Sequence, residues 1–455
     1  MSDRVLVYGV GVAGMATLRA LVKRGYDVVA ADDRADEAKR SAVAGLGVEL
    51  VVAPDESRIR SLVSSVDIVA PAPGIPESHP LIGRALEQRR VVMTELDLAY
   101  EWESSRENGP RPMLAVTGTD GKTTTVNMAE AMLAEAGRRT VACGNTEIPL
   151  VEALDMDVDS FVVEATSFRL AFVETFRAEA SAWLNLAPDH LDWHTSLETY
   201  ESAKARIWRN VRAADVAIGP VTDAVVSRHL SNLRCRRVFI GSSDYRMVDG
   251  VLQSKGDDIV AAAEMKRALP HDVTNALTAS ALCVESGLAP LDAVGRALRV
   301  FEAPHHRIEF VAESGGVRWF DDSKATTPHA ALTAIRGFEN VVLIAGGRNK
   351  DLDLSPMASE SGRVKAVVAI GDSAELIAAA FRDRTSGEMP VSIATTMDDA
   401  VATAAKVARK GDVVLLSPGC TSFDWYDGYA QRGEHFASCV RELIGTTKRR
   451  NGAAR

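Results

Sequence analysis

The chain of 455 residues is longer than one ordinary hydrophobic core, so we expect two to four domains. Its composition, 46% hydrophobic and 25% charged, is typical of a globular protein, and no apolar run approaches the ~20 residues of a membrane helix. A net charge of −10 argues against a general nucleic-acid binder, although a local cluster of Lys and Arg can still bind an anionic substrate.

The first section, residues 1–94, alternates strands with helices and predicts a parallel sheet covered by helices. A glycine-rich turn, residues 9–14, follows the first strand, and Asp32 ends the second, as in a dinucleotide-binding fingerprint. Such a turn holds any diphosphate, so both a nicotinamide cofactor and a nucleotide sugar remain open. The expected strands are Val5–Val10, Val28–Asp32, Val48–Ala53, Ile68–Pro71 and Val91–Met93.

The second section, residues 95–302, contains a phosphate-loop pattern. The apolar run Met113–Thr117 leads into Gly118-Thr119-Asp120-Gly121-Lys122-Thr123-Thr124, which predicts a buried strand, a loop and a helix start. Glycines let backbone N–H groups approach phosphate, Lys122 can reach the terminal phosphates, and the Thr123 hydroxyl can hold Mg²⁺. Because the loop is shorter than the common form, an ordinary glycine-rich turn is the alternative.

Two polar clusters follow expected strands of this section, Ser160–Ala165 and Ala182–Leu186. Glu164 stands at the carboxyl end of the first, where ligands bind in open parallel sheets, unless it simply faces solvent. Residues 189–194 contain two Asp and two His, including His190, a density that a packed core disfavours. These clusters favour a hydrated magnesium site, with zinc as the alternative.

Two helices are also expected in the second section. One covers Leu197–Asn210, with Thr195 and Glu198 as its capping box, and the other covers Ala276–Ser286.

The third section, residues 303–455, again alternates strands and helices. The turns after its strands carry Lys324, Thr326, Lys350 and Ser417, which we expect at one rim of one sheet, where they favour capture of a small multivalent anion. Arg307, near the start of the section, can clamp a phosphate bidentately. We expect strands over Val317–Phe320, Val341–Ala345, Ala366–Ile370 and Val413–Leu416, helices over Ser373–Phe381 and Met397–Lys410, and a disordered basic tail over Lys448–Arg455.

The number and spacing of the cysteines indicate the cellular compartment of the protein. The five cysteines are scattered and include no C-x-x-C pair, which is typical of free thiols rather than of a disulfide framework or a zinc site. The amino terminus leads almost directly into a strand-like segment without an apolar signal region. We therefore expect a cytoplasmic protein.

Over nearly its whole length the chain resembles the Mur ligases, ATP-dependent amino-acid ligases of peptidoglycan precursor synthesis. The phosphate loop is similar to that of the family. The segments Asp322–Thr326 and Ser417–Asp424 are similar to those of the members that add D-glutamate. The resemblance implies three α/β domains: a Rossmann-like UDP-binding domain (1–94), a P-loop ATPase-like domain (95–302) and a Rossmann-like amino-acid-binding domain (303–455).

The implied reaction joins D-glutamate to UDP-N-acetylmuramoyl-L-alanine through an acyl phosphate, catalysed by a monomer with small-molecule substrates and no nucleic-acid or membrane partner. A sister ligase that adds another amino acid is the nearest alternative. A nucleotide-sugar-binding oxidoreductase and a non-catalytic nucleotide-binding module are alternatives from other classes.

The resemblance also implies roles for individual residues. The catalytic residues are Lys122, His190, Lys204 and Lys324. ATP contacts Gly118, Thr119, Asp120, Gly121, Lys122, Thr123, Thr124, Asn275 and Arg307. The UDP substrate contacts Val12, Ala13, Asp32, Arg34, Gly74, Asn145 and Thr166. D-Glutamate contacts Lys324, Thr326, Lys350, Ser417 and Phe423. Mg²⁺, expected as two ions, is held by Thr123, Glu164, His190 and Lys204, the last as a carbamate. The chain departs from the family pattern at Asp120, Arg169 and Arg348-Asn349.

Overall fold

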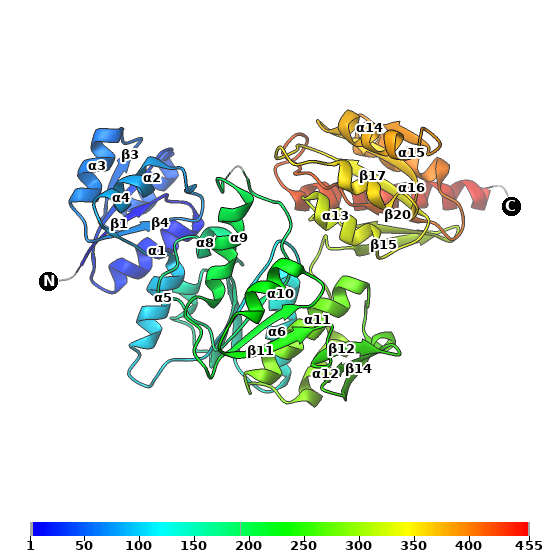
Figure 1. Ribbon diagram of the computed structural model, residues 1–455. Coiled ribbons are helices and arrows are strands. Elements are labelled where there is room, and N and C mark those ends of the chain that lie inside the picture. Colours follow the sequence, from blue (N-terminus) through cyan, green and yellow to red (C-terminus); the bar gives the residue numbers. More distant parts are fainter. Residues whose placement is uncertain (1–2, 192, 454–455) are drawn as a thin grey trace. The chain divides into compact units, whose positions relative to one another are not determined.

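The computed structural model describes residues 3–191 and 193–453, which form two compact units. The first unit comprises Met1–Ala268 and Asp272–Phe301, and the second comprises Leu269–His271 and Glu302–Arg455 (Figure 1). Parallel-rich sheets with helices packed on them make up both units, so the chain is a mixed α/β protein, as the alternation of elements predicts. Within the described residues no helix combines the length and apolarity of a membrane span. All five cysteines are free thiols.

The first sheet of the first unit is parallel, in the order β3-β2-β1-β4-β5. Val5 and Val7 of β1 pack in the same core cluster as α1, whereas Leu6 and Tyr8 pack with α3 and α4 on the opposite face. The strand order reverses between β1 and β4, and at such a switch point a doubly wound sheet opens a crevice for ligands. The strands are β1 (Arg4–Tyr8), β2 (Asp27–Asp32), β3 (Glu49–Val52), β4 (Ile68–Pro71) and β5 (Val91–Val92). The helices are α1 (Val12–Lys23), α2 (Glu37–Ala44), α3 (Glu56–Ser64), α4 (Pro80–Glu87) and α5 (Glu95–Ser104).

The second sheet of this unit has the order β14-β13-β12-β11-β10-β9-β6-β8-β7. It is parallel from β7 to β12, and β12, β13 and β14 form an antiparallel edge. The strands are β6 (Met113–Thr117), β7 (Thr140–Gly144), β8 (Ser160–Glu164), β9 (Ala180–Trp183), β10 (Val216–Pro220), β11 (Arg236–Ile240), β12 (Tyr245–Val248), β13 (Val251–Ser254) and β14 (Asp257–Ala261). The helical segments are α6 (Lys122–Glu135), α7 (Leu150–Ala153), α8 (Ser167–Leu170), α9 (Leu197–Ala205), η1 (Arg206–Trp208), α10 (Ala224–Ser231), η2 (Ala262–Glu264), α11 (Pro270–Glu285) and α12 (Leu291–Val300).

The sheet of the second unit has the order β15-β16-β20-β17-β18-β19 and is parallel except for β15. Helices α13 and α14 share a core cluster with one face, and α15 and α16 share one with the other. The strands are β15 (Glu309–Ser314), β16 (Val317–Asp321), β17 (Val341–Gly346), β18 (Val364–Ile370), β19 (Val391–Ile393) and β20 (Val413–Leu416). The helical segments are α13 (Pro328–Ile335), η3 (Ser355–Glu360), α14 (Ala374–Arg384), α15 (Met397–Val407) and α16 (Tyr429–Ala453).

The helix expected over Leu197–Asn210 begins at Leu197 as expected, but it differs in its cap and in its end. Its N-cap is Ser196, whose hydroxyl accepts from the backbone N–H of Thr199, so the proposed pairing of Thr195 with Glu198 is wrong. The α-helical part ends at Ala205 and a 3₁₀ turn, η1, follows. Both serine and threonine cap helices well, and the sequence alone did not discriminate between the adjacent pair.

Two other segments also differ. The strand expected over Ala182–Leu186 is β9 and ends at Trp183, because the residues after it turn toward the loop that follows β6. The assigned α16 extends to Ala453 and so overlaps the basic tail expected over Lys448–Arg455, of which 454–455 lie outside the described residues. Disorder of this tail stays a prediction. The strands β7, β10 to β15 and β19 had no counterpart among the expected elements.

Candidate functional site

The loop after β6 has the backbone geometry that phosphate binding requires. Gly118 and Gly121 have φ angles of +154° and +85°, which a side chain would strain. Gly121 is the N-cap of α6, so the N–H groups that follow it stand at a helix N-terminus, where anions are favoured. A Cβ on Gly121 would lie 2.7 Å from Oδ1 of Asn275, so this residue, expected to contact ATP, lies directly beside the loop.

Asn185, which follows β9, fixes the shape of the phosphate loop. Its Oδ1 accepts hydrogen bonds from the backbone N–H groups of Thr119 (3.0 Å) and Asp120 (2.9 Å). The Thr119 hydroxyl donates to the carbonyl of Ala187 and lies 3.1 Å from the hydroxyl of Tyr200. The loop therefore has its conformation before any nucleotide binds, which lowers the entropic cost of binding.

Two lysines converge on one carbonyl oxygen of the loop. Nζ of Lys122 donates to Gly118 O at 2.8 Å, and Nζ of Lys204, from α9, donates to the same oxygen at 2.7 Å. Lys204 is 1% exposed. Burial, and after it the positive charge of Lys122, hold the pKa of Lys204 well below its usual range. This shift makes the neutral amine of Lys204 more accessible than that of an exposed lysine, and such shifts are common at functional sites.

The ends of β6 and β8 carry buried oxygens without a hydrogen-bond partner among the described residues. They are Oε2 of Glu164 and the hydroxyls of Thr117 and Thr166. The two strands are neighbours, with Val116 opposite Glu164. Buried polar atoms are normally paired, so these oxygens call for an ion, a ligand or water. Carboxylate and hydroxyl oxygens suit Mg²⁺, and the residues present therefore fit that ion.

His190 lies in the loop between β9 and α9, with φ of +54°. Its Nε2 is 3.1 Å from Oδ2 of Asp189, and its ring lies edge-on to Phe168 at 4.6 Å between centroids. Phe168 belongs to α8, which follows β8, so the ring contact links the histidine to the end of the Glu164 strand. The structure thus orients His190 through one carboxylate and one aromatic face.

A chain of polar side chains, which includes the exposed Asn145, also leads to Glu164. Asn145 donates to Oε1 of Glu164 at 2.9 Å, and Arg169 donates to Oδ1 of Asn145 at 2.6 Å. Arg169 also pairs with Glu95, 3.2 Å away, and both side chains are buried. Arg169, one of the departures from the family pattern, therefore orients Asn145 and through it Glu164.

Five of the seven residues expected to contact the UDP substrate lie at the carboxyl edge of the first sheet, at or just after the ends of β1, β2 and β4. The other two, Asn145 and Thr166, follow β7 and β8 of the second sheet. The two carboxylate oxygens of Asp32 accept hydrogen bonds from the backbone N–H groups of Val10 and Arg34, each at 2.7 Å. Asp32 therefore shapes the glycine-rich loop. A Cβ on Gly14 would lie 1.8 Å from the carbonyl oxygen of Gly9, which explains the requirement for glycine there. Val12 is 78% exposed at the start of α1. Ala13 and Gly74 complete the set, in α1 and after β4.

In the second unit the loops after β16, β17 and β20 share one sheet edge, as the sequence predicts, because these strands are neighbours. The loop after β16 carries Lys324 and Thr326, and the loop after β17 carries Lys350. The loop after β20 carries Ser417 and Phe423. Phe423 is 61% exposed.

Two backbone hydrogen bonds of 3.0 Å between Arg348 and Thr421 join the loops after β17 and β20. The Ser417 hydroxyl is buried and donates to Oδ2 of Asp322 at 2.7 Å. The structure thus gives this hydroxyl a protein partner. The expected contact of Ser417 with D-glutamate stays a prediction.

Asp322 and Arg432 organise this edge and were not expected as functional residues. Asp322 accepts from the backbone N–H of Ile308 at 3.2 Å as well as from Ser417, and burial raises its pKa to about 7. Arg432, from α16, is 1% exposed and donates to the backbone of Ser323 and Thr421, so it holds two site loops together. No local pattern distinguishes an arginine in an amphipathic helix from a surface residue.

Arg307 lies in the second unit, before β15. Its neighbours His306 and Ile308 have φ of +61° and +48°, the left-handed region, so the backbone of this segment is strained. Nδ1 of His306 forms a hydrogen bond of 2.6 Å with Oδ2 of Asp321. This hydrogen bond to a carboxylate raises the pKa of His306.

The comparisons with known proteins agree with this site. Residues 116–283 match the Mur ligase middle domain, and residues 306–420 match the Mur ligase glutamate ligase domain. The chain is 40% identical to UDP-N-acetylmuramoylalanine–D-glutamate ligase of Frankia casuarinae, over 97% of this chain and 94% of the relative. The protein of the same name from Thermobifida fusca is 36% identical, over 97% and 99%.

The chain belongs to the Mur ligase family.

Solved structures of Mur ligases have the same fold. UDP-N-acetylmuramate-alanine ligase of Thermotoga maritima matches with a TM-score of 0.59 at 19% identity, over 97% of this chain and 100% of that one. MurF of Acinetobacter baumannii also gives a TM-score of 0.59, at 16% identity, over 96% and 93%. In this Mur ligase Asn185, Asp322 and Arg432 are the organising residues that the motifs did not identify. Asn185 was placed inside the expected strand Ala182–Leu186, whereas β9 ends at Trp183, so its role in the loop depends on where the strand stops.

Proposed function

We propose that this Mur ligase joins D-glutamate to UDP-N-acetylmuramoyl-L-alanine at the expense of ATP. The observation that carries the proposal is the match, over 97% of the chain, to relatives named for this activity, with an intact phosphate loop. A sister ligase is not favoured, because the relatives that match nearly the whole chain at 36–40% identity are named for the addition of D-glutamate. The oxidoreductase alternative is not favoured either, since the glycine-rich turn after β1 suits the diphosphate of a nucleotide sugar equally well.

Each of three domains binds one of the three substrates. Residues 1–94 hold the UDP substrate at the β1–β4 switch point, residues 95–302 hold ATP at the loop after β6, and residues 303–455 hold the amino acid. The assignment is supported by the three sheets, each with its candidate residues at the carboxyl ends of parallel strands, where α/β proteins bind ligands.

In the first step a carboxylate oxygen of UDP-N-acetylmuramoyl-L-alanine attacks the γ-phosphorus, and the bond to the β,γ-bridging oxygen breaks. An acyl phosphate and ADP result. Because two anions approach each other, cations must neutralise charge along the path, and Lys122 is placed on the loop for this role. Mg²⁺, held by Thr123, Glu164, His190 and a modified Lys204, supplies further electrostatic stabilisation when bound.

Lys204 becomes a ligand by carbamylation. Its neutral amine attacks CO₂, the new N–C bond forms, and one proton leaves, which converts a side chain that repels Mg²⁺ into an anion. The pKa of Lys204, held low by burial and by Lys122, favours the amine that this reaction needs. Carbamylation also removes the repulsion between the two lysines that share the Gly118 carbonyl.

In the second step the amine of D-glutamate attacks the acyl carbon, phosphate leaves, and the amide forms after loss of a proton. Each carboxylate of D-glutamate needs donors in a desolvated site. Lys324, Lys350 and Thr326 supply charge and hydroxyl donors at the edge that Arg432 holds together.

An assay of ADP release tests the function. Purified enzyme should release ADP over many turnovers only when UDP-N-acetylmuramoyl-L-alanine and D-glutamate are both present, and not when L-glutamate, L-alanine or a nicotinamide cofactor replaces D-glutamate. Lys122→Ala should lower kcat by about 10²-fold or more. Lys406→Ala, at an exposed lysine of α15, is the matched control and should retain full activity. ADP release that another amino acid supports equally well would reject the D-glutamate assignment.

A further inference from the structure

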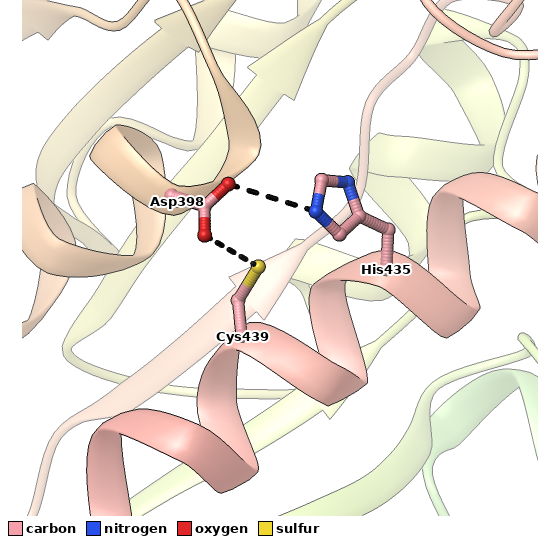
Figure 2. Close-up of side chains that lie close together, drawn as sticks. All are labelled: Asp398, His435 and Cys439. Atoms are coloured by element: carbon pink, nitrogen blue, oxygen red, sulfur yellow. Dashed lines mark hydrogen bonds and ion pairs between the residues drawn. The ribbon is translucent and has the colours of Figure 1, made fainter. Parts of the chain in front are cut away.

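Three potential metal-binding side chains meet on the second unit, at the N-terminal end of α15 and one face of α16. His435 and Cys439 are four residues apart on α16 and so lie on the same side of that helix. Asp398 comes from the first turn of α15. Figure 2 shows the carboxylate between the imidazole and the thiol. None of these residues belongs to the proposed ATP, UDP-substrate or amino-acid sites.

The separations suit one small cation. Oδ2 of Asp398 is 3.6 Å from Nε2 of His435, and Oδ1 is 3.6 Å from Sγ of Cys439. The three ligand atoms all lie within 4.8 Å of one another. Ligand atoms on one tetrahedral Zn²⁺, with bonds of about 2.0–2.3 Å, are roughly 3.3–3.8 Å apart. The three side chains therefore need only a small adjustment to bind the same ion.

A second contact prepares the histidine for this role. The hydroxyl of Tyr426 lies 2.9 Å from Nδ1 of His435, so the nitrogen that faces Asp398 is Nε2. A hydrogen bond at the other ring nitrogen is the usual way in which proteins orient a metal-binding histidine.

The burial of the three residues also distinguishes the cluster from an ordinary surface ion pair. The side chain of Asp398 is 71% exposed and that of His435 is 42% exposed, and such a pair alone contributes little to stability. Cys439, however, is buried in the same core cluster as Met397 and Phe436, which fixes the position of its sulfur. The exposed side leaves room for water as a fourth ligand.

We propose that Asp398, His435 and Cys439 form a zinc-binding site that joins α15 to α16. Thiolate and imidazole ligands select Zn²⁺ over Mg²⁺, which prefers oxygen ligands in octahedral geometry, so this ion is distinct from the magnesium of the ligase reaction. The site is structural. Because the backbone N–H of Tyr426 donates to the carbonyl of Ser422, the ion is linked through Tyr426 to the loop that carries Phe423.

Cobalt binding to the full-length chain tests the proposal without reference to activity. After removal of metals with a chelator, the protein should bind one equivalent of Co²⁺ with a thiolate-to-cobalt charge-transfer band. Zn²⁺ should abolish the band, and excess Mg²⁺ should leave it unchanged. Cys439→Ala should eliminate the band. Cys235→Ser, at a half-buried cysteine of the first unit, is the matched control and should retain it.

Two further variants separate ligand loss from misfolding. Asp398→Asn changes an exposed side chain and should raise the Zn²⁺ dissociation constant at least tenfold. Tyr426→Phe removes only the hydroxyl and should raise it by about 10- to 100-fold. Absence of a charge-transfer band in the wild type, or a band and zinc affinity unchanged in Cys439→Ala or Asp398→Asn, would overturn the proposal. Loss of the band in Cys235→Ser would assign the thiolate elsewhere and equally overturn it.

Discussion

The ammonium group of Lys204 donates a hydrogen bond to the carbonyl oxygen of Gly118 at 2.7 Å, from a side chain with almost no exposure to solvent. This contact places a lysine from α9 against the first glycine of the phosphate loop, beside the ammonium group of Lys122. Positive charges on both amino groups would repel each other, and only Lys204 is buried, so the arrangement favours neutralising or modifying Lys204.

The first prediction concerns that modification. Enzyme equilibrated with ¹³C-labelled CO₂ should show a carbamate carbon resonance in NMR spectra, and Lys204→Ala should lack it. Lys204→Ala should also lose nearly all ligase activity, with partial rescue by short carboxylic acids that replace the missing anion. Lys406→Ala should resemble the wild type in both measurements. A wild-type spectrum without the resonance, together with full activity of Lys204→Ala, would exclude the carbamate.

The second prediction concerns stability against pH. Burial raises the pKa of Asp322 to about 7 in the folded protein, above the usual value of about 4 in an unfolded chain. The folded state therefore binds the proton more tightly. The stabilisation from protonated Asp322 is complete below pH 4 and is lost as the pH rises to about 7.

The asparagine side chain of the Asp322→Asn variant is uncharged at every pH. The melting temperature of this variant minus that of the wild type should therefore rise between pH 5 and pH 8. Asp372→Asn, at an exposed carboxylate of the same unit, is the control and should show a nearly constant difference. A difference for Asp322→Asn that is independent of pH would contradict the assignment.

The third prediction concerns the buried pair of Arg169 and Glu95. Arg169→Ala leaves a buried carboxylate without its partner, which costs about 3–5 kcal/mol of unfolding free energy. The double variant Arg169→Ala, Glu95→Gln should recover much of this loss, because neither charge then remains unpaired. Urea denaturation of the single and double variants gives the coupling free energy. Strict additivity of the two effects would show that the pair does not act as a unit.

The fourth prediction concerns Asn185. Replacement by Ala removes the acceptor for the backbone N–H groups of Thr119 and Asp120, so the phosphate loop loses its preorganised shape. KM for ATP should rise by about tenfold or more, which corresponds to a loss of about 1.4 kcal/mol or more of binding free energy. The KM values for the UDP substrate and D-glutamate should change far less. A uniform rise in all three would indicate a general folding defect.

Several features of the fold and the site follow from local sequence. Val341–Gly346 is a continuous apolar run and forms β17, a strand buried on both faces, as parallel sheets require. The phosphate loop can be predicted from the spacing of Gly118, Gly121 and Lys122, because this spacing is typical of one backbone conformation. Glu164 was identified because the carboxyl end of a buried strand is a recurrent ligand position.

The remaining features depend on contacts between distant segments. Arg432 lies about 110 residues from Ser323, and its role exists only because α16 packs beside the loop after β16. The low pKa of Lys204 likewise results from burial against a loop 86 positions earlier in the chain. The antiparallel strands β12 to β14 are short and half-polar, so their pattern resembles that of turns.

An isotope-transfer experiment tests the proposed reaction most directly. UDP-N-acetylmuramoyl-L-alanine labelled with ¹⁸O in both carboxylate oxygens is incubated with the enzyme, ATP and D-glutamate, and the phosphate released is examined by mass spectrometry. If the carboxylate attacks the γ-phosphorus, each phosphate should carry one ¹⁸O atom and the amide product should retain the other. Phosphate without ¹⁸O, formed alongside the amide product, would contradict the acyl-phosphate mechanism and with it the account of how the Lys122 and Lys204 site works.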